Sequence, residues 1–231
     1  MNKKDILERL KGGLIVSCQA LPDEPMHGKG IMAKMAHSAE LGGAYGIRAN
    51  GKEDVMEIKS ITNLPVIAII KKEYSDSRVY ITPTEREIKE LVECGANIVA
   101  MDATNRPRPG GVSLKELFSR VRKLYPDTIF MADCSNYEEG LAAQDMGFDI
   151  VGTTLAGYTE YTKGRTLPDF ELIKKLSASL KIPVIAEGGI WTPDDLKKAL
   201  SCGAHAAVIG TAITRPREIT KRFCSVLKSK D

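Results

Sequence analysis

Eight short hydrophobic runs, separated by charged amphipathic segments, are the feature that most restricts the fold of this 231-residue chain. The runs are continuously apolar, which is typical of parallel strands that are covered on both faces. They lie at 14–19, 45–49, 65–71, 97–103, 128–134, 149–155, 183–189 and 206–212. Between them, segments 83–95, 113–125 and 192–203 are predicted as helices, with Thr82, Ser113 and Thr192 as their N-caps.

The spacing of glycines at the ends of predicted helices indicates an internal repeat. Gly43, Gly95, Gly147 and Gly203 each precede a predicted strand, at intervals of 52, 52 and 56 residues. Each interval spans two strand–helix units, and four such pairs of units make eight strands, which favours a closed (β/α)8 TIM barrel. An open doubly wound sheet usually carries G-x-G-x-x-G after its first strand, but residues 17–25 contain no glycine. We therefore predict an α/β protein, a single barrel domain over 1–231.

Composition argues against several classes of function. The 33 basic and 30 acidic residues leave a formal net charge of +3, too balanced to predict a nucleic-acid or membrane surface. No apolar run approaches the roughly 18 residues of a membrane span, and residues 1–13 lack the apolar core of a signal peptide. The five cysteines are widely spread, so neither a disulfide framework nor a zinc site is predicted. We expect a cytoplasmic protein.

Polar residues stand at the C-terminal ends of the predicted strands, where TIM barrels place their chemistry. In chain order they are Gln19, Arg48, Lys71, Asp102, Asp133, Thr153 with Thr154, Glu187 and Gly210. Any one of them alone is equally well explained as a cap or a solvated strand edge. Because nearly every strand end is polar, together they indicate one functional site.

Lys71 and Glu187 are the strongest candidates for acid–base chemistry. A buried or cation-flanked lysine can lower its pKa from about 10.4 towards 7–8 and act as a base or as an imine-forming amine. A salt bridge between Lys71 and a carboxylate such as Glu187 is the structural alternative. The third and seventh strands lie on opposite sides of a barrel, however, so we predict that the two side chains flank a substrate.

A metal site and a redox cofactor are not predicted. Asp102 and Asp133 could ligate a metal, but none of the three histidines, His27, His37 and His205, lies at a strand end. The sequence also lacks a binding fingerprint for a redox cofactor.

The last two strands carry a second signal. Gly188 and Gly189 follow the seventh strand, Gly210 follows the eighth, and Arg215 comes soon after it. Phosphate-binding TIM barrels hold their phosphate on the loops after these two strands, and an arginine can donate two parallel hydrogen bonds to it. We therefore predict phosphate-binding loops after strands 7 and 8 and a small phosphorylated substrate.

Nine motifs, spread in order from about residue 12 to 224, identify the chain as similar to a known family. They are IVSCQALPDEPMH (15–27), GGAYGIRANG (42–51), IIKKEY (69–74), YITPT (80–84), MDATNRPRP (101–109), ADCS (132–135), GTTLAGYT (152–159), IAEGGIWTP (185–193) and GTAITRP (210–216). Together they resemble the N-acylmannosamine-6-phosphate 2-epimerases of bacterial sialic-acid catabolism, which interconvert the 6-phosphates of N-acetylmannosamine and N-acetylglucosamine. One departure is Gly189, where many relatives carry a larger polar residue.

The resemblance implies a role for each matched position. Lys71 would remove and return the proton at C2 of the ring-opened sugar, and Glu187 would act on the sugar oxygens. The implied substrate contacts are Gln19, Arg48, Asp133, Thr153 and Tyr158, with Gly210 and Arg215 holding the phosphate. An amine base, an acid for oxygen and fixed cations suit a reaction that passes through an enolate-like oxyanion. No cofactor is implied, and family members are commonly homodimers.

The residues alone leave other functions open. A pentulose-phosphate epimerase would be expected to bring metal-binding histidines to strand ends, and a Schiff-base aldolase would use Lys71 covalently. A non-catalytic phosphosugar sensor would have no need for both Lys71 and Glu187. The segment 217–227 is apolar on one face, which could cover the bottom of the barrel or a partner chain.

Overall fold

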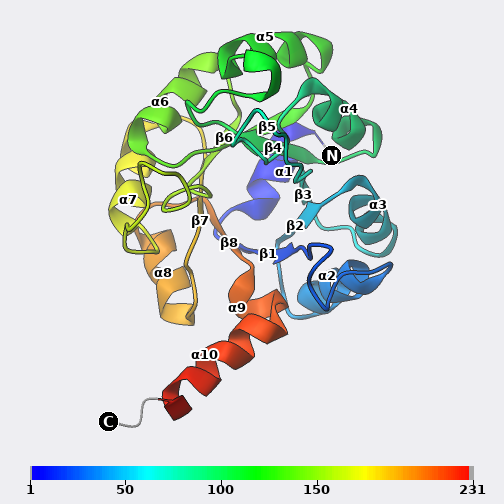
Figure 1. Ribbon diagram of the computed structural model, residues 1–231, viewed down its shortest axis with the longest axis vertical. Coiled ribbons are helices and arrows are strands. Elements are labelled where there is room, and N and C mark those ends of the chain that lie inside the picture. The colour runs from blue at the N-terminus through cyan, green and yellow to red at the C-terminus, as the bar shows by residue number, and fades with distance from the viewer. Residues whose placement is uncertain (1, 229–231) are drawn as a thin grey trace.

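The computed structural model describes residues 2–228 and shows eight parallel strands closed into a barrel (Figure 1). The strands pair in chain order, and β8 closes the ring on β1. They are β1 Leu14–Cys18, β2 Gly46–Asn50, β3 Val66–Ile69, β4 Ile98–Asp102, β5 Ile129–Asp133, β6 Ile150–Gly152, β7 Val184–Glu187 and β8 Ala206–Ile209. The predicted (β/α)8 fold is confirmed. Position 1 and positions 229–231 of the predicted domain lie outside the described residues.

Helices surround the barrel and also close one end of it (Figure 1). The surrounding helices are α2 Ile31–Leu41, α3 Lys52–Ile61, α4 Glu85–Glu93, α5 Leu114–Leu124, α6 Tyr137–Met146, α7 Phe170–Ser179 and α8 Pro193–Ser201. A 3₁₀ turn, Pro109–Gly111, precedes α5. Helix α1, Lys3–Leu10, covers the N-terminal ends of the strands, because its buried Leu10 packs with Ile15 and Ile67 inside the barrel. Gly46 makes room for it, since a Cβ there would lie 2.6 Å from Leu10 Cδ2.

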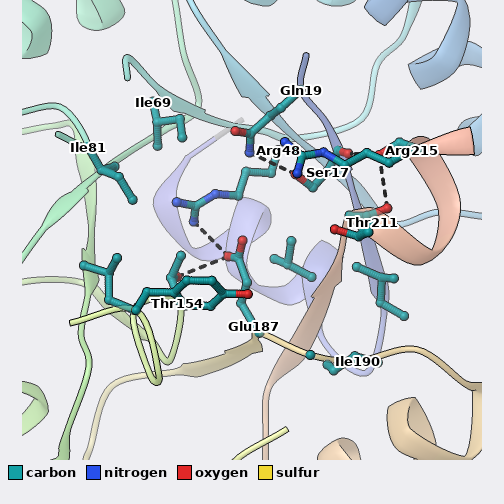
Figure 2. Close-up of a pocket in the computed structure, with 18 of the residues that line it drawn as sticks. Ser17, Gln19, Arg48, Ile69, Ile81, Thr154, Glu187, Ile190, Thr211 and Arg215 are labelled. Atoms are coloured by element: carbon teal, nitrogen blue, oxygen red, sulfur yellow. Dashed lines mark hydrogen bonds and ion pairs between the residues drawn. The ribbon is translucent and has the colours of Figure 1, made fainter. Parts of the chain in front are cut away.

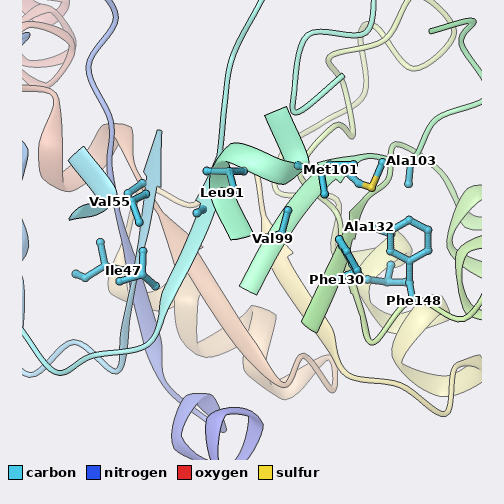
Figure 3. Close-up of a cluster of buried hydrophobic side chains, with 14 of the residues drawn as sticks. Ile47, Val55, Leu91, Val99, Met101, Ala103, Phe130, Ala132 and Phe148 are labelled. Atoms are coloured by element: carbon cyan, nitrogen blue, oxygen red, sulfur yellow. The ribbon is translucent and has the colours of Figure 1, made fainter. Parts of the chain in front are cut away.

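The barrel has two apolar layers, one inside the ring of strands and one outside it. Successive side chains of a strand point to opposite faces, so each strand supplies both layers. On β4, Ile98 and Ala100 point inward while Val99 and Met101 point outward. Figure 3 shows part of the outer layer, where Val99 lies near Leu91 of α4. This two-sided burial explains why the strands are continuously hydrophobic in sequence.

The N-cap predictions hold for two helices and fail for the third. Ser113 and Thr192 cap α5 and α8, as predicted. Helix α4, however, is capped by Thr84, whose side chain forms a capping box with Glu87. Thr82 has a positive φ of 44° and instead pairs with Ile70, accepting from its N–H at 3.2 Å. Thr82 is therefore part of the loop between β3 and α4, and this prediction was wrong.

Several strands are shorter than predicted. β3 ends at Ile69, so Lys71 lies beyond it and forms an antiparallel bridge with Ile81 from the same loop. The predicted eighth strand extended to residue 212, but Thr211–Thr214 form the short helix α9. Thr211 and Ala212 were mistaken for strand residues because one turn of helix is too short to show a period.

The last helix, α10 Pro216–Lys228, extends away from the barrel (Figure 1). It packs against α9, and the guanidinium of Arg222 lies over the ring of Trp191, 4.5 Å from its centre. Its apolar residues Phe223, Val226 and Leu227 are 71–74% exposed. The possibility that this segment covers the bottom of the barrel was therefore wrong, because α1 occupies that end. No helix within residues 2–228 has the length and apolar character needed to cross a membrane.

Candidate active site

A cavity of about 320 Å³ opens at the C-terminal ends of the strands (Figure 2). Nine of the predicted site residues line it: Gln19, Arg48, Lys71, Tyr158, Glu187, Gly188, Gly189, Gly210 and Arg215. Asp133 and Thr153 do not line it. Residues that are far apart in the chain meet here because every parallel strand ends at the same rim.

Arg48 is at the centre of the site and is completely buried. It lies on β2 between Ile47 and Ala49, whose side chains point outward, so its own side chain points into the barrel. Its guanidinium donates two hydrogen bonds to Asp133, of 3.1 and 2.6 Å, and lies 3.1 Å from Glu187 Oε2. Burial alone would lower the pKa of Arg48, but the charges of Asp133 and Glu187 outweigh it and raise that pKa. Arg48 is therefore a fixed cation.

Glu187 ends β7 and directs its carboxylate towards Arg48 (Figure 2). Burial raises the pKa of Glu187 to about 7, although the charge of Arg48 opposes this. Thr154 Oγ1 lies 3.2 Å from Glu187 Oε2 and 2.6 Å from Asp133 Oδ1. The hydroxyl has one proton, and the shorter distance favours donation to Asp133. The hydroxyl oxygen can then accept a hydrogen bond from the neutral form of Glu187.

Lys71 enters the cavity from the loop after β3 and is held there by its backbone. Its N–H donates to Asn50 Oδ1 at 2.7 Å, and the bridge to Ile81 fixes the chain on the other side. Burial lowers the pKa of Lys71 to about 8, with further lowering by Arg215 and Arg48. Among residues 2–228 no carboxylate forms an ion pair within 4.0 Å of its ammonium. Lys71 and Glu187 thus face the cavity without pairing, as the barrel topology predicts.

The glycine loops after β7 and β8 form another part of the cavity wall. Gly188 and Gly189 have φ values of +109° and +72°, which favour glycine. A Cβ on Gly189 would lie 2.4 Å from Leu167 Cβ and 3.0 Å from the Leu167 carbonyl carbon. A side chain at position 189 would therefore require Leu167 to move. Gly210 precedes α9, and Arg215 follows it.

Arg215 is held in place by Glu24, from the loop between β1 and α2. The two side chains form an ion pair of 3.1 Å, and Glu24 also lies 3.7 Å from Arg217 and accepts the N–H of Leu21 at 2.9 Å. Glu24 and Arg217 do not line the cavity, whereas Arg215 does. Glu24 therefore supports Arg215 from behind and links the first loop of the barrel to the last.

The two predicted contacts that do not line the cavity hold neighbouring groups instead. Asp133 is buried beneath Arg48 and engages its guanidinium. Thr153 is bonded to the backbone of Glu187, accepting its N–H at 3.0 Å and donating to its carbonyl at 2.9 Å. The threonine that lines the cavity is Thr154. Asp102, the other candidate metal ligand, forms a 2.6 Å ion pair with Arg106.

Several residues at the site were missed as functional residues by the sequence analysis. Asn50 and Glu24 position the two cations Lys71 and Arg215, and Tyr80 lines the cavity. Tyr80 lies within the YITPT motif and Glu24 within the IVSCQALPDEPMH motif. The motifs marked these regions without indicating which side chain faces inward. Asn50 follows Arg48 by two residues on β2, so strand alternation could have placed both on the same side.

Comparison with known proteins identifies the family of the chain. Residues 32–229 match the model of a family described as "Putative N-acetylmannosamine-6-phosphate epimerase". The chain belongs to this family. Two relatives named "Putative N-acetylmannosamine-6-phosphate 2-epimerase" are 53% identical in Caldanaerobacter subterraneus subsp. tengcongensis and 52% identical in Clostridioides difficile. The alignments cover 98% of this chain and 95% of the first relative, and 96% and 99% for the second.

Solved structures show the same similarity in three dimensions. The N-acetylmannosamine-6-phosphate 2-epimerase from Clostridium perfringens superposes with a TM-score of 0.92 at 51% identity, over 96% of each chain. The thiamine phosphate pyrophosphorylase from Pyrococcus furiosus has a TM-score of 0.64 at 18% identity, over 96% of each chain. The second likeness shows the barrel fold alone.

We predict that Lys71 titrates near pH 8 and that Arg215→Gln moves this midpoint upward. Arg215 is a cation that lowers the pKa of Lys71, so its removal makes the ammonium form less costly. Trace acetylation of Lys71, followed by peptide mass spectrometry across pH, measures the midpoint. Arg217→Gln is the matched control, because Arg217 also contacts Glu24 but does not line the cavity. A midpoint near that of an ordinary lysine in the unaltered protein would refute the assignment.

Proposed function

We propose that this protein interconverts N-acetylmannosamine 6-phosphate and N-acetylglucosamine 6-phosphate by removing and returning the proton at C2, as a step of sialic-acid catabolism. The observation that carries the proposal is the placement of Lys71, with a pKa lowered to about 8, in one cavity with Arg48 and Glu187. Membership of an epimerase family supports the same reaction.

The proposed reaction begins with opening of the sugar ring, because the C2 proton is acidic only next to an open aldehyde. Glu187, with a pKa raised to about 7, exchanges protons with the sugar oxygens. Lys71 takes the C2 proton as a free amine. Removal of this proton leaves an enolate-like oxyanion, and Arg48 supplies a fixed positive charge near it. Return of a proton to the opposite face of C2 inverts the configuration.

The lowered pKa makes Lys71 available as a base near neutral pH. A lysine with a pKa of about 8 is free amine in about one-tenth of molecules at pH 7, against about 0.04% at the ordinary value of about 10.4. Burial and the nearby guanidinium groups thus raise the supply of free amine by about 250-fold. The remaining wall supplies the other proposed contacts: Gln19 and Tyr158 for the sugar, and Gly188, Gly189, Gly210 and Arg215 for the phosphate. Asp133 and Thr153 are proposed to act through Arg48 and Glu187.

We predict that Lys71→Ala abolishes both epimerisation and exchange of the C2 proton with deuterated solvent. Removal of a positioned base typically costs about 10²–10⁴ in rate. Glu187→Gln keeps the shape but removes the charge, and should also reduce turnover severely. Proton NMR of the 6-phosphates in heavy water measures both turnover and exchange.

Lys72→Ala is the matched control for Lys71→Ala, since Lys72 lies next in the chain, pairs with Glu87 and does not line the cavity. If Lys71→Ala retained near-normal deuterium incorporation at C2, the proton would belong to another residue and the role of Lys71 would be wrong.

The phosphate is predicted to bind on the glycine loops and Arg215. Arg215→Ala should raise KM by about 10- to 150-fold and lower kcat much less. The reason is that it removes a charge-assisted contact worth roughly 1.5–3 kcal/mol. Unphosphorylated N-acetylmannosamine should be a very poor substrate. Arg217→Ala, measured in the same steady-state assay, should change KM much less. Equal kcat/KM values for the free sugar and its 6-phosphate would exclude a phosphate site.

We also propose that the protein is a cytoplasmic, single-domain homodimer, which binds neither nucleic acid nor membrane. The scattered cysteines support the cytoplasmic location. The small net charge of +3 supports the proposal that the protein binds neither nucleic acid nor membrane. For the dimer, the support comes from α10. A short helix is marginally stable in water unless its apolar face is covered, and Ile219, Phe223, Val226 and Leu227 recur at helical spacing on one face. We propose that a second copy of the chain covers this face.

The dimer is predicted to depend on the apolar face of α10. Phe223→Glu should convert a particle of twice 25.2 kDa into a monomer, because it places a charge in the proposed interface. Light scattering coupled to size-exclusion chromatography measures the mass. Ser225→Glu adds the same charge on the other side of the helix and should leave the dimer intact. A monomeric unaltered protein at micromolar concentration would disprove the dimer.

A further inference from the structure

One side of the cavity, away from Arg215 and Thr211, is apolar. Ile69 ends β3, Ile81 lies in the loop after it, and Leu155 follows β6; all three line the cavity. They are only 1–2% exposed and belong to the apolar layer inside the barrel. In Figure 2, Ile69 and Ile81 lie on one side of the cavity and Arg215 on the other. Arg48 and Glu187 lie between these sides.

The backbone places this apolar wall next to Lys71. Ile81 is the residue directly opposite Lys71 in their antiparallel bridge. Ile69 precedes Lys71 by two residues, and both side chains line the cavity. Ile69 and Ile81 thus flank the point where the Lys71 side chain enters the cavity, and its ammonium lies within range of the charges of Arg215 and Arg48.

Tyr80 adds a polar group to the same wall. It precedes Ile81 and lines the cavity, and within residues 2–228 its hydroxyl has no hydrogen-bond partner. Burial raises the pKa of Tyr80, so the phenol keeps its proton at neutral pH and can donate it. A donor that faces a cavity without a protein partner is suited to an acceptor on a ligand.

The chemistry of the proposed substrate matches this arrangement from end to end. A 2-acylamino sugar 6-phosphate carries its acyl group on C2, the carbon that loses the proton, and its phosphate at the far end of the chain. If the phosphate binds near Arg215, C1 and C2 extend past Arg48 and Glu187 towards Ile69 and Ile81. The alkyl end of the acyl group gains from an apolar wall, and its carbonyl oxygen needs a donor.

We infer that Ile69, Ile81 and Leu155, together with the Tyr80 hydroxyl, form a subsite for the N-acyl group and limit its length to that of an acetyl group. This inference rests on the proposed function, because it uses the position of C2 beside Lys71. Tyr80 donates to the acyl carbonyl, and the two isoleucines close the space beyond the acetyl methyl.

The test compares the 6-phosphates of N-acetyl-, N-propanoyl- and N-butanoylmannosamine. The unaltered protein should have a clearly higher kcat/KM for the N-acetyl substrate than for the N-butanoyl one. Ile81→Ala should raise the N-butanoyl to N-acetyl ratio by about 10-fold or more, since each methylene in a fitted apolar pocket changes kcat/KM by about 10- to 200-fold. Ile81→Val removes a single methyl and should shift the ratio in the same direction by less, which protects the test if Ile81→Ala folds poorly.

Ile190→Ala is the matched control. Ile190 lines the same cavity but lies in the loop after β7, next to Gly188 and Gly189, which are proposed to bind the phosphate. Its truncation should therefore leave the acyl ratio unchanged. Tyr80→Phe removes only the hydroxyl and should raise KM about 10-fold for all three substrates without changing the ratio, because all three carry the same carbonyl.

The outcomes separate this inference from the proposed function. The acyl subsite would be overturned if the unaltered protein turns over the N-acetyl substrate and the acyl ratios are the same in Ile81→Ala, Ile81→Val and Ile190→Ala. That result would still support the epimerase activity. A Tyr80→Phe KM equal to that of the unaltered protein would remove Tyr80 from the subsite. No turnover of any substrate by the unaltered protein would refute the epimerase itself.

Discussion

The guanidinium of Arg48, buried inside the barrel and shared between Asp133 and Glu187, is the interaction on which the site depends. A buried cation is tolerated only when it is paired and hydrogen-bonded. Asp133 supplies that pairing with two hydrogen bonds, which leaves the second carboxylate, Glu187, held mainly by charge and by Thr154. The two carboxylates differ in role for this reason: one fixes the cation from below, and the other faces the cavity.

Burial is the main cause of the shifted pKa values of Glu187 and Lys71, and the same cation modifies both. The charge of Arg48 opposes the rise in the pKa of Glu187 and adds to the fall in the pKa of Lys71. Both pKa values therefore come within about one unit of neutrality, at about 7 and about 8. Arg215 acts in the same direction on Lys71, so a phosphate bound to Arg215 would partly cancel its effect. Glu24 already provides such a counter-charge when no substrate is bound.

The fold and the outline of the site could be predicted from sequence because both follow from strand order. Continuous apolar runs mark the strands, and a parallel barrel brings every strand end to one rim, so Arg48, Lys71 and Glu187 could be placed together. Side-chain direction could not be predicted as well. The choice between Thr153 and Thr154 depends on where β6 ends, and the burial of Asp133 depends on Arg48 above it. Thr82 was chosen as a cap because threonine favours that position, but tertiary pairing with Ile70 determines its backbone.

Perturbed ionisation also has a thermodynamic consequence for the fold. Lys71 has a folded-state pKa of about 8 and an unfolded value near 10.5, so between these values the unfolded chain binds more protons than the folded one. Stability arising from Lys71 therefore increases as pH rises through that window, and below pH 8 the charged lysine costs roughly 3 kcal/mol. Glu187 acts in the opposite sense: its folded-state pKa is raised from 4.5 to about 7, so its contribution falls as pH rises from about 4.5 to 7. Between pH 7 and 8 both groups are mainly charged and both destabilise the folded state. The burial of the two apolar layers of the barrel must offset this cost in folding free energy. The cost arises at Lys71 and Glu187, where the proposed chemistry needs a free amine and a proton-donating acid.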